Sequence, residues 1–132
     1  MFKGSNVALV TPFKNDKLDD EAYIKLIHFH IKNGTNGLVP AGTTGESPTL
    51  SHDEHERVIE LCVKESKGKL PVFAGTGSNS TEEAISLTKH AEKIGANGVL
   101  VGELSSRVSW LVSRGDGFDV LDIPARLAAK SW

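Results

Sequence analysis

The chain has 132 residues, of which 39% are hydrophobic and 24% are charged, a composition typical of one soluble globular domain large enough to bury a core. The net charge of -2, with Lys and Glu interspersed, argues against a nucleic-acid partner. No stretch approaches the roughly 20 apolar residues that span a bilayer, so no membrane association is expected. The single cysteine, Cys62, has no disulfide partner, and no signal-peptide pattern is seen. We therefore expect a cytoplasmic protein.

Short β-rich runs recur along the first hundred residues, with helical patterns between them, at 6–10, 37–40, 71–74 and 98–101. Because the runs are almost wholly apolar and are separated by helices, they should be parallel strands buried on both faces. The last helix carries an apolar stripe at helical spacing, formed by Ala84, Leu87, Ala91 and Ile94. The sequence therefore predicts a repeated strand–helix unit.

The expected helices have marked ends. Ser51 and Ser80 each precede a glutamate by three residues, which is the pattern of a capping box. Glycines that can take a left-handed conformation supply the stops at Gly34, Gly68 and Gly95. Two α/β architectures fit such units, the open doubly wound sheet and the closed barrel. A closed barrel needs about eight units and about 250 residues, whereas this chain supplies four.

The strand–helix pattern breaks after the fourth run, so we divide the chain into 1–101 and a tail, 102–132. Both tryptophans (Trp110 and Trp132) lie in the tail, as do all arginines except Arg57, and every lysine except Lys130 precedes it. No capped helix follows the fourth run. We expect an irregular tail produced by an out-of-frame reading or a foreign junction, with a genuine divergent tail as the alternative.

The segment most suggestive of chemistry is Ala-Gly-Thr-Thr-Gly-Glu-Ser at 41–47, directly after the second predicted strand. Its glycines let the backbone bend sharply, so that amide groups can converge on an anion, and Thr43 and Thr44 add hydroxyl donors. A carboxylate-sized ligand fits better than a triphosphate, because no Gly-Lys-Ser/Thr follows as in a P-loop. The alternative is an ordinary tight turn after a strand.

The longer string at 42–55 resembles the signature of the 4-hydroxy-tetrahydrodipicolinate synthase family. Segments in the same order and spacing as in that family are found at 2–5, 10–13, 74–79 and 81–84. The resemblance covers about residues 1–101. It implies an α/β fold of the (β/α)8 TIM barrel type, of which the chain would hold only the first four βα units, a half barrel, plus the irregular tail, 102–132, which is not native to the family.

The resemblance implies a lyase that condenses pyruvate with L-aspartate 4-semialdehyde through a lysine Schiff base, in lysine biosynthesis by the diaminopimelate pathway. It implies no metal and no organic cofactor, and a homo-oligomer, a homotetramer in the family. Thr44 matches the residue that holds the pyruvate carboxylate, and Thr43 matches the threonine of the proton relay. A hydroxyl suits a relay because it donates and accepts a proton simultaneously.

The chain departs from the family after the fourth strand. The family's Val-Thr-Pro-Tyr-Tyr is replaced at 102–106, so the relay tyrosines have no counterpart. The Schiff-base lysine is also absent, and Lys130 lies at no corresponding position. A carbonyl-activating amine must be desolvated and aimed at its substrate, so the chain as given is expected to be inactive.

Two histidines, His52 and His55, fall on one face at the start of the second helix. A metal site is rejected because the spacing is not His-Glu-x-x-His and no third ligand is evident. One interpretation is a solvated, acidic helix start. The resemblance implies another, a feedback site for lysine formed by Ser47, Pro48, His52, His55, Gly77, Asn79 and Glu83.

Two alternatives to the synthase remain. The first is another pyruvate-dependent aldolase of the superfamily, of the N-acetylneuraminate lyase or sugar-acid aldolase type, although such enzymes usually place serine where Thr43 stands. The second is a non-catalytic, truncated fragment. The other histidines, His28, His30 and His90, are interpreted as solvated, and Tyr23 as a helix-packing residue.

Overall fold

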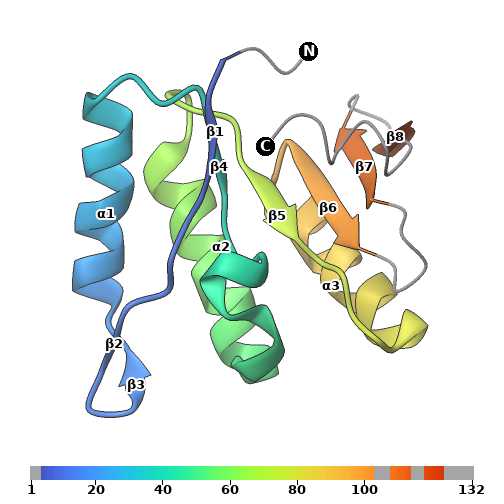
Figure 1. The fold of residues 1–132 in the computed structure, drawn as a ribbon, viewed down its shortest axis with the longest axis horizontal. Coiled ribbons are helices and arrows are strands. Elements are labelled where there is room, and N and C mark those ends of the chain that lie inside the picture. Colours follow the sequence, from blue (N-terminus) through green and yellow to red (C-terminus); the bar gives the residue numbers. More distant parts are fainter. Residues whose placement is uncertain (1–3, 103–107, 114–117, 124–132) are drawn as a thin grey trace.

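The computed structural model describes residues 4–102, 108–113 and 118–123, and strands alternate with helices through the first of these ranges (Figure 1). The alternating elements are β1 (Asn6–Ala8), α1 (Asp20–Lys32), β4 (Gly37–Val39), α2 (His52–Ser66), β5 (Phe73–Gly75), α3 (Thr81–Lys93) and β6 (Gly98–Gly102). The predicted strand–helix repeat is confirmed, although β1 and β4 are shorter than expected.

The four strands lie side by side in chain order. β1 pairs parallel with β4, with Val7 opposite Leu38, and β5 pairs parallel with β6, with Ala74 opposite Val99. A parallel bridge between Leu38 and Val72 joins the two pairs. The predicted parallel arrangement is confirmed, and it places the carboxyl ends of all four strands at one edge.

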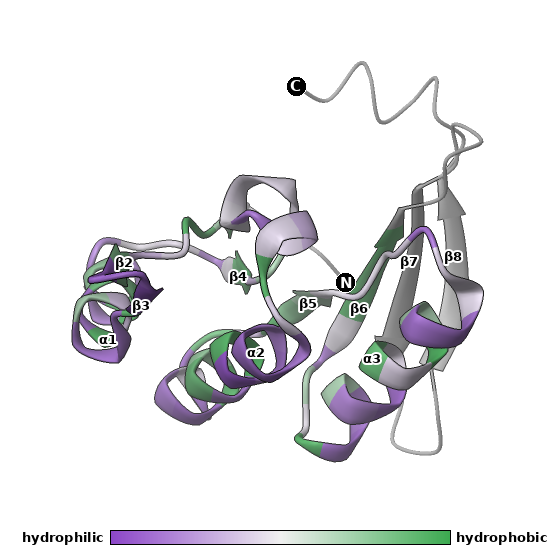
Figure 2. Cartoon of the chain, turned by 90° about the horizontal axis from the view of Figure 1, so that it is seen from below, coloured by the Kyte–Doolittle hydropathy of each residue, from purple (hydrophilic) through white to green (hydrophobic). Residues whose placement is uncertain are grey.

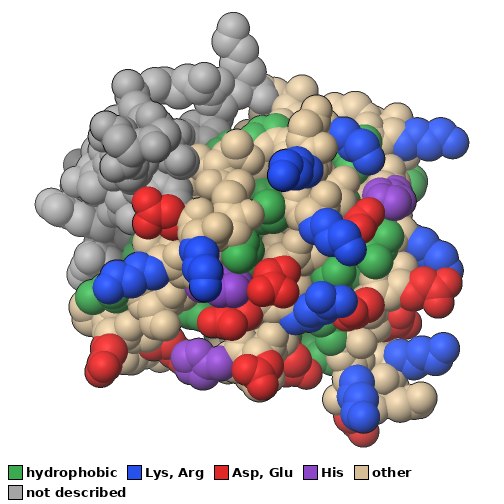
Figure 3. Space-filling view, turned by 180° about the vertical axis from the view of Figure 1, so that it is seen from behind, with side chains coloured by type: hydrophobic (Ala, Val, Ile, Leu, Met, Phe, Trp, Pro, Cys, Tyr) green, Lys and Arg blue, Asp and Glu red, His purple; other side chains and the backbone are tan. Residues whose placement is uncertain are grey.

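The three helices cover one side of these strands (Figure 2). Each helix buries apolar residues against the strands, as α1 does with Tyr23 and Ile27 and α2 with Val58 and Ile59. On α3, Leu87 and Ala91 are buried, which confirms the predicted stripe. The outward side of the helices mixes acidic and basic side chains without a patch of one sign (Figure 3).

The predicted helix ends are largely confirmed. Ser51 forms a complete capping box with Glu54, and the three predicted stops have positive φ, 80° at Gly34, 74° at Gly68 and 89° at Gly95. The second capping box is half wrong. Ser80 accepts from the backbone of Glu83, but the Glu83 carboxylate contacts His52 and Ser78 and does not return to the backbone of Ser80.

Sequence reasoning missed a small hairpin between β1 and α1. Strands β2 (Phe13–Lys14) and β3 (Lys17–Leu18) pair antiparallel across a two-residue turn. Asn15 and Asp16 form that turn with φ values of 52° and 58°, and both residue types tolerate the left-handed region. The adjacent Asn and Asp were the signal that could have found it.

The expectation of an irregular tail is wrong for the described part of 102–132. Strands β7 (Val108–Ser113) and β8 (Phe118–Ile123) continue the sheet from β6, and both pairings are antiparallel. The two segments contain Val, Trp, Phe and Ile, which favour extended backbone, so local propensity accounts for the strands. Lys130 and residues 103–107 lie outside the described residues.

Polar side chains link neighbouring helices. Arg57 on α2 contacts Asp20 on α1 at 2.7 Å, and His28 lies 2.8 Å from Glu65 across the same pair of helices. His28 is half exposed, as predicted. His90 is not solvated, because its side chain is 16% exposed and lies 3.7 Å from Glu56 and from Glu60 on α2. None of the described helices is long and apolar enough to cross a bilayer.

Candidate functional site

The Thr43–Thr44 pair lies where sequence reasoning expected it, on a turn beyond the carboxyl end of β4. The turn consists of two 3-10 helices, η1 (Thr43–Gly45) and η2 (Ser47–Thr49), joined by Glu46 with φ 59°. Both threonines are exposed. Their hydroxyls are therefore presented at the edge where the strands end, which is the functional edge of an α/β fold.

The backbone of this turn provides fewer free amides than an open anion nest would. Gly45 and Glu46 donate to the carbonyls of Gly42 and Thr43, each at 3.0 Å, and Ser47 donates to Gly42 at 3.3 Å. These three amides are engaged inside the turn. An anion bound here would therefore rely on the threonine hydroxyls and on the amides at the start of η1.

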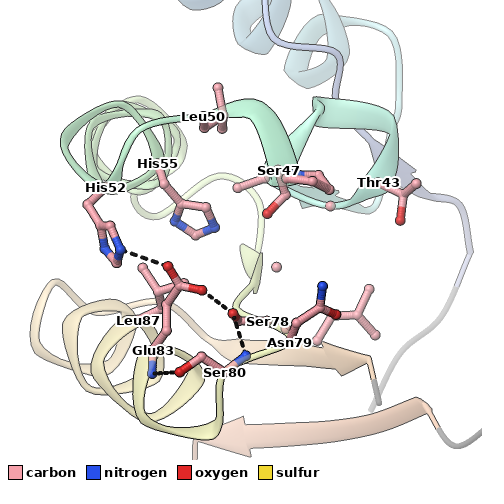
Figure 4. Close-up of a pocket in the computed structure, with 16 residues that line it drawn as sticks. Thr43, Ser47, Leu50, His52, His55, Ser78, Asn79, Ser80, Glu83 and Leu87 are labelled. Carbon is pink, nitrogen blue, oxygen red and sulfur yellow. Dashed lines mark hydrogen bonds and ion pairs between the residues drawn. The ribbon is translucent and has the colours of Figure 1, made fainter. Parts of the chain in front are cut away.

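A cavity of about 580 Å³ lies between this turn, the first turn of α2 and the loop before α3 (Figure 4). All seven residues predicted for the feedback site line it, namely Ser47, Pro48, His52, His55, Gly77, Asn79 and Glu83. Thr43 also lines the cavity, whereas Thr44 is not among its lining residues. The structure thus brings together residues that are up to forty positions apart in the sequence.

The polar centre of the cavity is the Glu83 carboxylate on α3. His52 Nε2 lies 2.7 Å from one carboxylate oxygen, and the Ser78 hydroxyl donates to the other (Figure 4). The hydrogen bond from Ser78 lowers the pKa of Glu83, and the nearby His52 acts in the same direction against partial burial. The carboxylate is therefore ionised near neutral pH and can accept from a cationic donor.

Sequence reasoning missed Ser78, and it found Ser80 only as a helix cap, although both serines line the cavity. The Ser78 hydroxyl also accepts a hydrogen bond from the Ser80 amide at 3.1 Å, so it connects the loop before α3 to Glu83. The two serines flank Asn79, which the resemblance did pick out. A search for further hydroxyls just before the helix cap would have found Ser78 as well, because serine is favoured at helix starts.

His55 differs from His52. The residue is 4% exposed, whereas the side chain of His52 is 63% exposed, so a solvated helix start describes only His52. Neither ring nitrogen of His55 reaches a partner at hydrogen-bonding geometry within the described residues, although the Gly75 backbone is close enough to influence the ring. Burial lowers the pKa of His55, and the Gly75 backbone opposes this shift. The cavity wall thus carries a neutral imidazole.

Two further titratable side chains, Cys62 and Tyr23, are buried in the described core, and burial favours the neutral form of each. Cys62 is buried, and burial raises the pKa of its thiol to about 12. Tyr23 packs against it from α1, fully buried, which confirms the helix-packing prediction. Within the described part of the chain, no cluster of three or more His, Cys, Asp or Glu side chains is arranged to hold a metal ion.

Comparison with known proteins places this site in a family. The sequence model of the Dihydrodipicolinate synthetase family matches residues 1–102. A 4-hydroxy-tetrahydrodipicolinate synthase of Pelagibacter ubique is 80% identical over 101 residues, and one of Parvibaculum lavamentivorans is 66% identical over 100 residues. Both alignments cover 76% of this chain and 34% of the relative, so the chain spans about a third of the length of these relatives.

Similar solved structures carry the same family name. Dihydrodipicolinate synthase from Aquifex aeolicus matches with a TM-score of 0.74 and 56% identity, over 76% of this chain and 34% of that one. The Acinetobacter baumannii enzyme, whose structure is described as complexed with pyruvate, matches with a TM-score of 0.74 and 46% identity, over 76% of this chain and 35% of that one. These names do not favour the N-acetylneuraminate lyase or sugar-acid aldolase alternative. The fold class is the TIM barrel, and the chain belongs to the dihydrodipicolinate synthetase family.

Proposed function

We propose that residues 1–101 are the first four βα units of a 4-hydroxy-tetrahydrodipicolinate synthase, a lyase that condenses pyruvate with L-aspartate 4-semialdehyde. The observation that carries the proposal is the exposed Thr43–Thr44 pair on the turn after β4, within a segment 80% identical to a synthase of that name. The half barrel and the exclusion of 102–132 from the family belong to the same proposal. The match to the family ends at residue 102. Strand β6, which ends there, pairs parallel with β5 before it but antiparallel with β7 after it.

In this proposal the turn binds pyruvate and moves a proton. The Thr44 hydroxyl donates to the pyruvate carboxylate, and the Thr43 hydroxyl passes a proton during condensation, since it can donate and accept in one step. The imine forms between the pyruvate carbonyl and a lysine of the remaining barrel, with release of water. That lysine has no counterpart in this chain, so the 132-residue polypeptide alone is proposed to be inactive.

The cavity beside the turn is proposed to bind L-lysine as a feedback inhibitor. The ionised Glu83 carboxylate would pair with an ammonium group, and Asn79 and Ser47 would supply hydrogen bonds. An amino acid carries the charges that such a site can recognise. The enzyme is proposed to work as a cytoplasmic homotetramer in lysine biosynthesis by the diaminopimelate pathway, with no metal or organic cofactor.

Trapping of the imine tests the proposal. We define the fusion enzyme as residues 1–101 of this chain followed by the corresponding C-terminal part of the Pelagibacter ubique relative. Borohydride reduction in the presence of pyruvate should attach pyruvate covalently to a lysine of the fusion enzyme and leave the 132-residue polypeptide unlabelled. An adduct on the polypeptide, or a fusion enzyme that folds but forms no adduct and no product, would contradict it.

Substitution of the two threonines should affect different kinetic constants of the fusion enzyme. Thr43→Val should lower kcat by on the order of 10²–10⁴, because the relay loses a proton-transferring hydroxyl. Thr44→Val should mainly raise the KM for pyruvate, because a donor to the carboxylate is lost. Steady-state kinetics at varied pyruvate separates these effects, and wild-type turnover in Thr43→Val would refute the relay role.

A further inference from the structure

We propose that Thr11 is a positioning residue for the Thr43–Thr44 turn. Its Oγ1 donates a hydrogen bond of 2.7 Å to the carbonyl oxygen of Gly45, the residue directly after Thr44, from a position 34 residues earlier in the chain. Thr11 itself is 7% exposed. The inference rests on the proposed role of the turn and adds a residue to which no function has been assigned above.

The contact lies at the end of η1, directly after the two threonines. Gly45 is buried and packs closely against the segment after β1, where a Cβ on Gly45 would lie 3.0 Å from the Leu9 carbonyl oxygen and 3.2 Å from Thr11 Oγ1. The segment after β1 and the end of η1 are therefore in direct contact. A buried hydrogen bond at such a contact fixes its geometry, because the carbonyl would lose a partner if the turn shifted.

Other hydrogen bonds among the described residues fix the turn from within and fix its approach from β5. Inside it, the amides of Gly45 and Glu46 each donate to the carbonyl three residues earlier. On the entry side, the amide of Gly75 on β5 donates to the Pro40 carbonyl at 2.9 Å. The exposed residues Thr43 and Thr44 thus lie between Pro40, whose carbonyl is bonded to β5, and Gly45, whose carbonyl is bonded to Thr11.

This arrangement predicts a kinetic signature. Thr11 is buried and acts on both threonines through the backbone of Gly45, so removal of its hydroxyl should disturb carboxylate binding and proton transfer together. The pyruvate KM should rise and kcat should fall, whereas Thr43→Val and Thr44→Val each affect mainly one of the two. A displacement of about 1 Å at a reacting group can cost on the order of 10²-fold in rate.

The test uses four variants of the fusion enzyme. Thr11→Val removes the hydroxyl and keeps the shape, and Thr11→Ser keeps the hydroxyl. Thr88→Val is the matched control, since it removes a threonine hydroxyl that bonds Thr76 Oγ1 at 3.0 Å and lies outside the turn. Thr44→Val reports on the proposed pyruvate site independently of Thr11.

We expect Thr11→Val to lower kcat/KM for pyruvate by about tenfold or more per folded enzyme, with Thr11→Ser close to wild type. Thr11→Ala gives the same comparison if Thr11→Val does not fold. Wild-type kinetics in Thr11→Val, or equal losses in Thr11→Ser or Thr88→Val, would overturn the positioning role. If Thr44→Val has no effect on the pyruvate KM, the proposed function of the turn fails first, which separates that failure from the failure of this inference.

Discussion

The Nε2 atom of His52 lies 2.7 Å from Oε1 of Glu83, which joins the first turn of α2 to the first turn of α3 across the mouth of the cavity. The second carboxylate oxygen accepts from Ser78. A carboxylate has about four lone-pair sites, so two contacts leave acceptor capacity for an incoming ammonium group. The contacts with His52 and Ser78 therefore orient Glu83 and leave part of its acceptor capacity free.

Glu83→Gln should weaken the inhibition of the fusion enzyme by L-lysine. A charge-assisted hydrogen bond to the ligand is lost, which should raise the L-lysine concentration for half inhibition by about tenfold or more. Glu82→Gln, at the exposed neighbouring position, is the control, and L-lysine should inhibit this variant as it inhibits the unsubstituted fusion enzyme. Inhibition curves with L-lysine decide the matter, and an unchanged curve for Glu83→Gln would remove this residue from the proposed site.

Ser51→Ala should destabilise the chain more than Ser80→Ala does. The Ser51 hydroxyl lies 3.3 Å from the Glu54 amide, and Glu54 returns a 2.9 Å contact to the Ser51 amide. The Ser80 contact is a single, longer bond of 3.4 Å. We expect Ser51→Ala to lower the free energy of unfolding by about 1 kcal/mol and Ser80→Ala by about half as much or less. Urea denaturation of both variants measures the difference, and equal losses would count against it.

The strand–helix repeat could be predicted because each element satisfies local rules. Apolar runs mark the strands, and Ser51 caps the start of α2. Gly68, which has a positive φ, lies just beyond the end of that helix. The site residues of the turn and cavity came from a specific resemblance, and the fold then placed all seven proposed feedback residues around one cavity.

What sequence reasoning missed depends on contacts between distant residues. The capping pattern at Ser80 was misread because Glu83 has stronger partners in His52 and Ser78. His90 was taken as solvated because its neighbours on α3 are polar, yet α2 packs over it. Neither outcome can be read from one helix, since each depends on how α2 and α3 lie together.

Gly75→Ala should strongly destabilise the chain. A Cβ at this position would lie 2.2 Å from the carbonyl oxygen of Ala41, which belongs to backbone and cannot move aside as a flexible side chain could. We expect a loss of about 1–3 kcal/mol or more in the free energy of unfolding. Gly42→Ala is the matched control, because its Cβ would meet nothing closer than Val39 Cγ1 at 4.0 Å. Its loss should be about 0.5 kcal/mol or less, and comparable denaturation midpoints for the two variants would contradict the steric argument.

The buried His55 should make stability depend on pH. Burial lowers its pKa in the folded chain below the ordinary value of 6.5, with the Gly75 backbone and the Glu83 and Glu56 carboxylates opposing the shift. As pH falls through 6.5, the unfolded chain therefore binds more protons than the folded chain, and the free energy of unfolding decreases. The contribution of the neutral imidazole is fully present above that value and is lost below it.

The measurement compares the wild-type chain with His55→Gln, which keeps a polar side chain but cannot titrate. Urea denaturation at pH 8, 7, 6 and 5.5 gives the free energy of unfolding of each. Other titrating groups are common to both chains, so the difference between the two curves isolates His55, provided that the substitution leaves Glu83 and Glu56 in place. The wild-type free energy should fall relative to that of His55→Gln as the pH drops below 6.5, because only the wild type must exclude a proton from a buried ring. A difference that stays constant from pH 8 to 5.5 would show that His55 titrates equally in the folded and unfolded chains, and hence that its ring is not held neutral by burial.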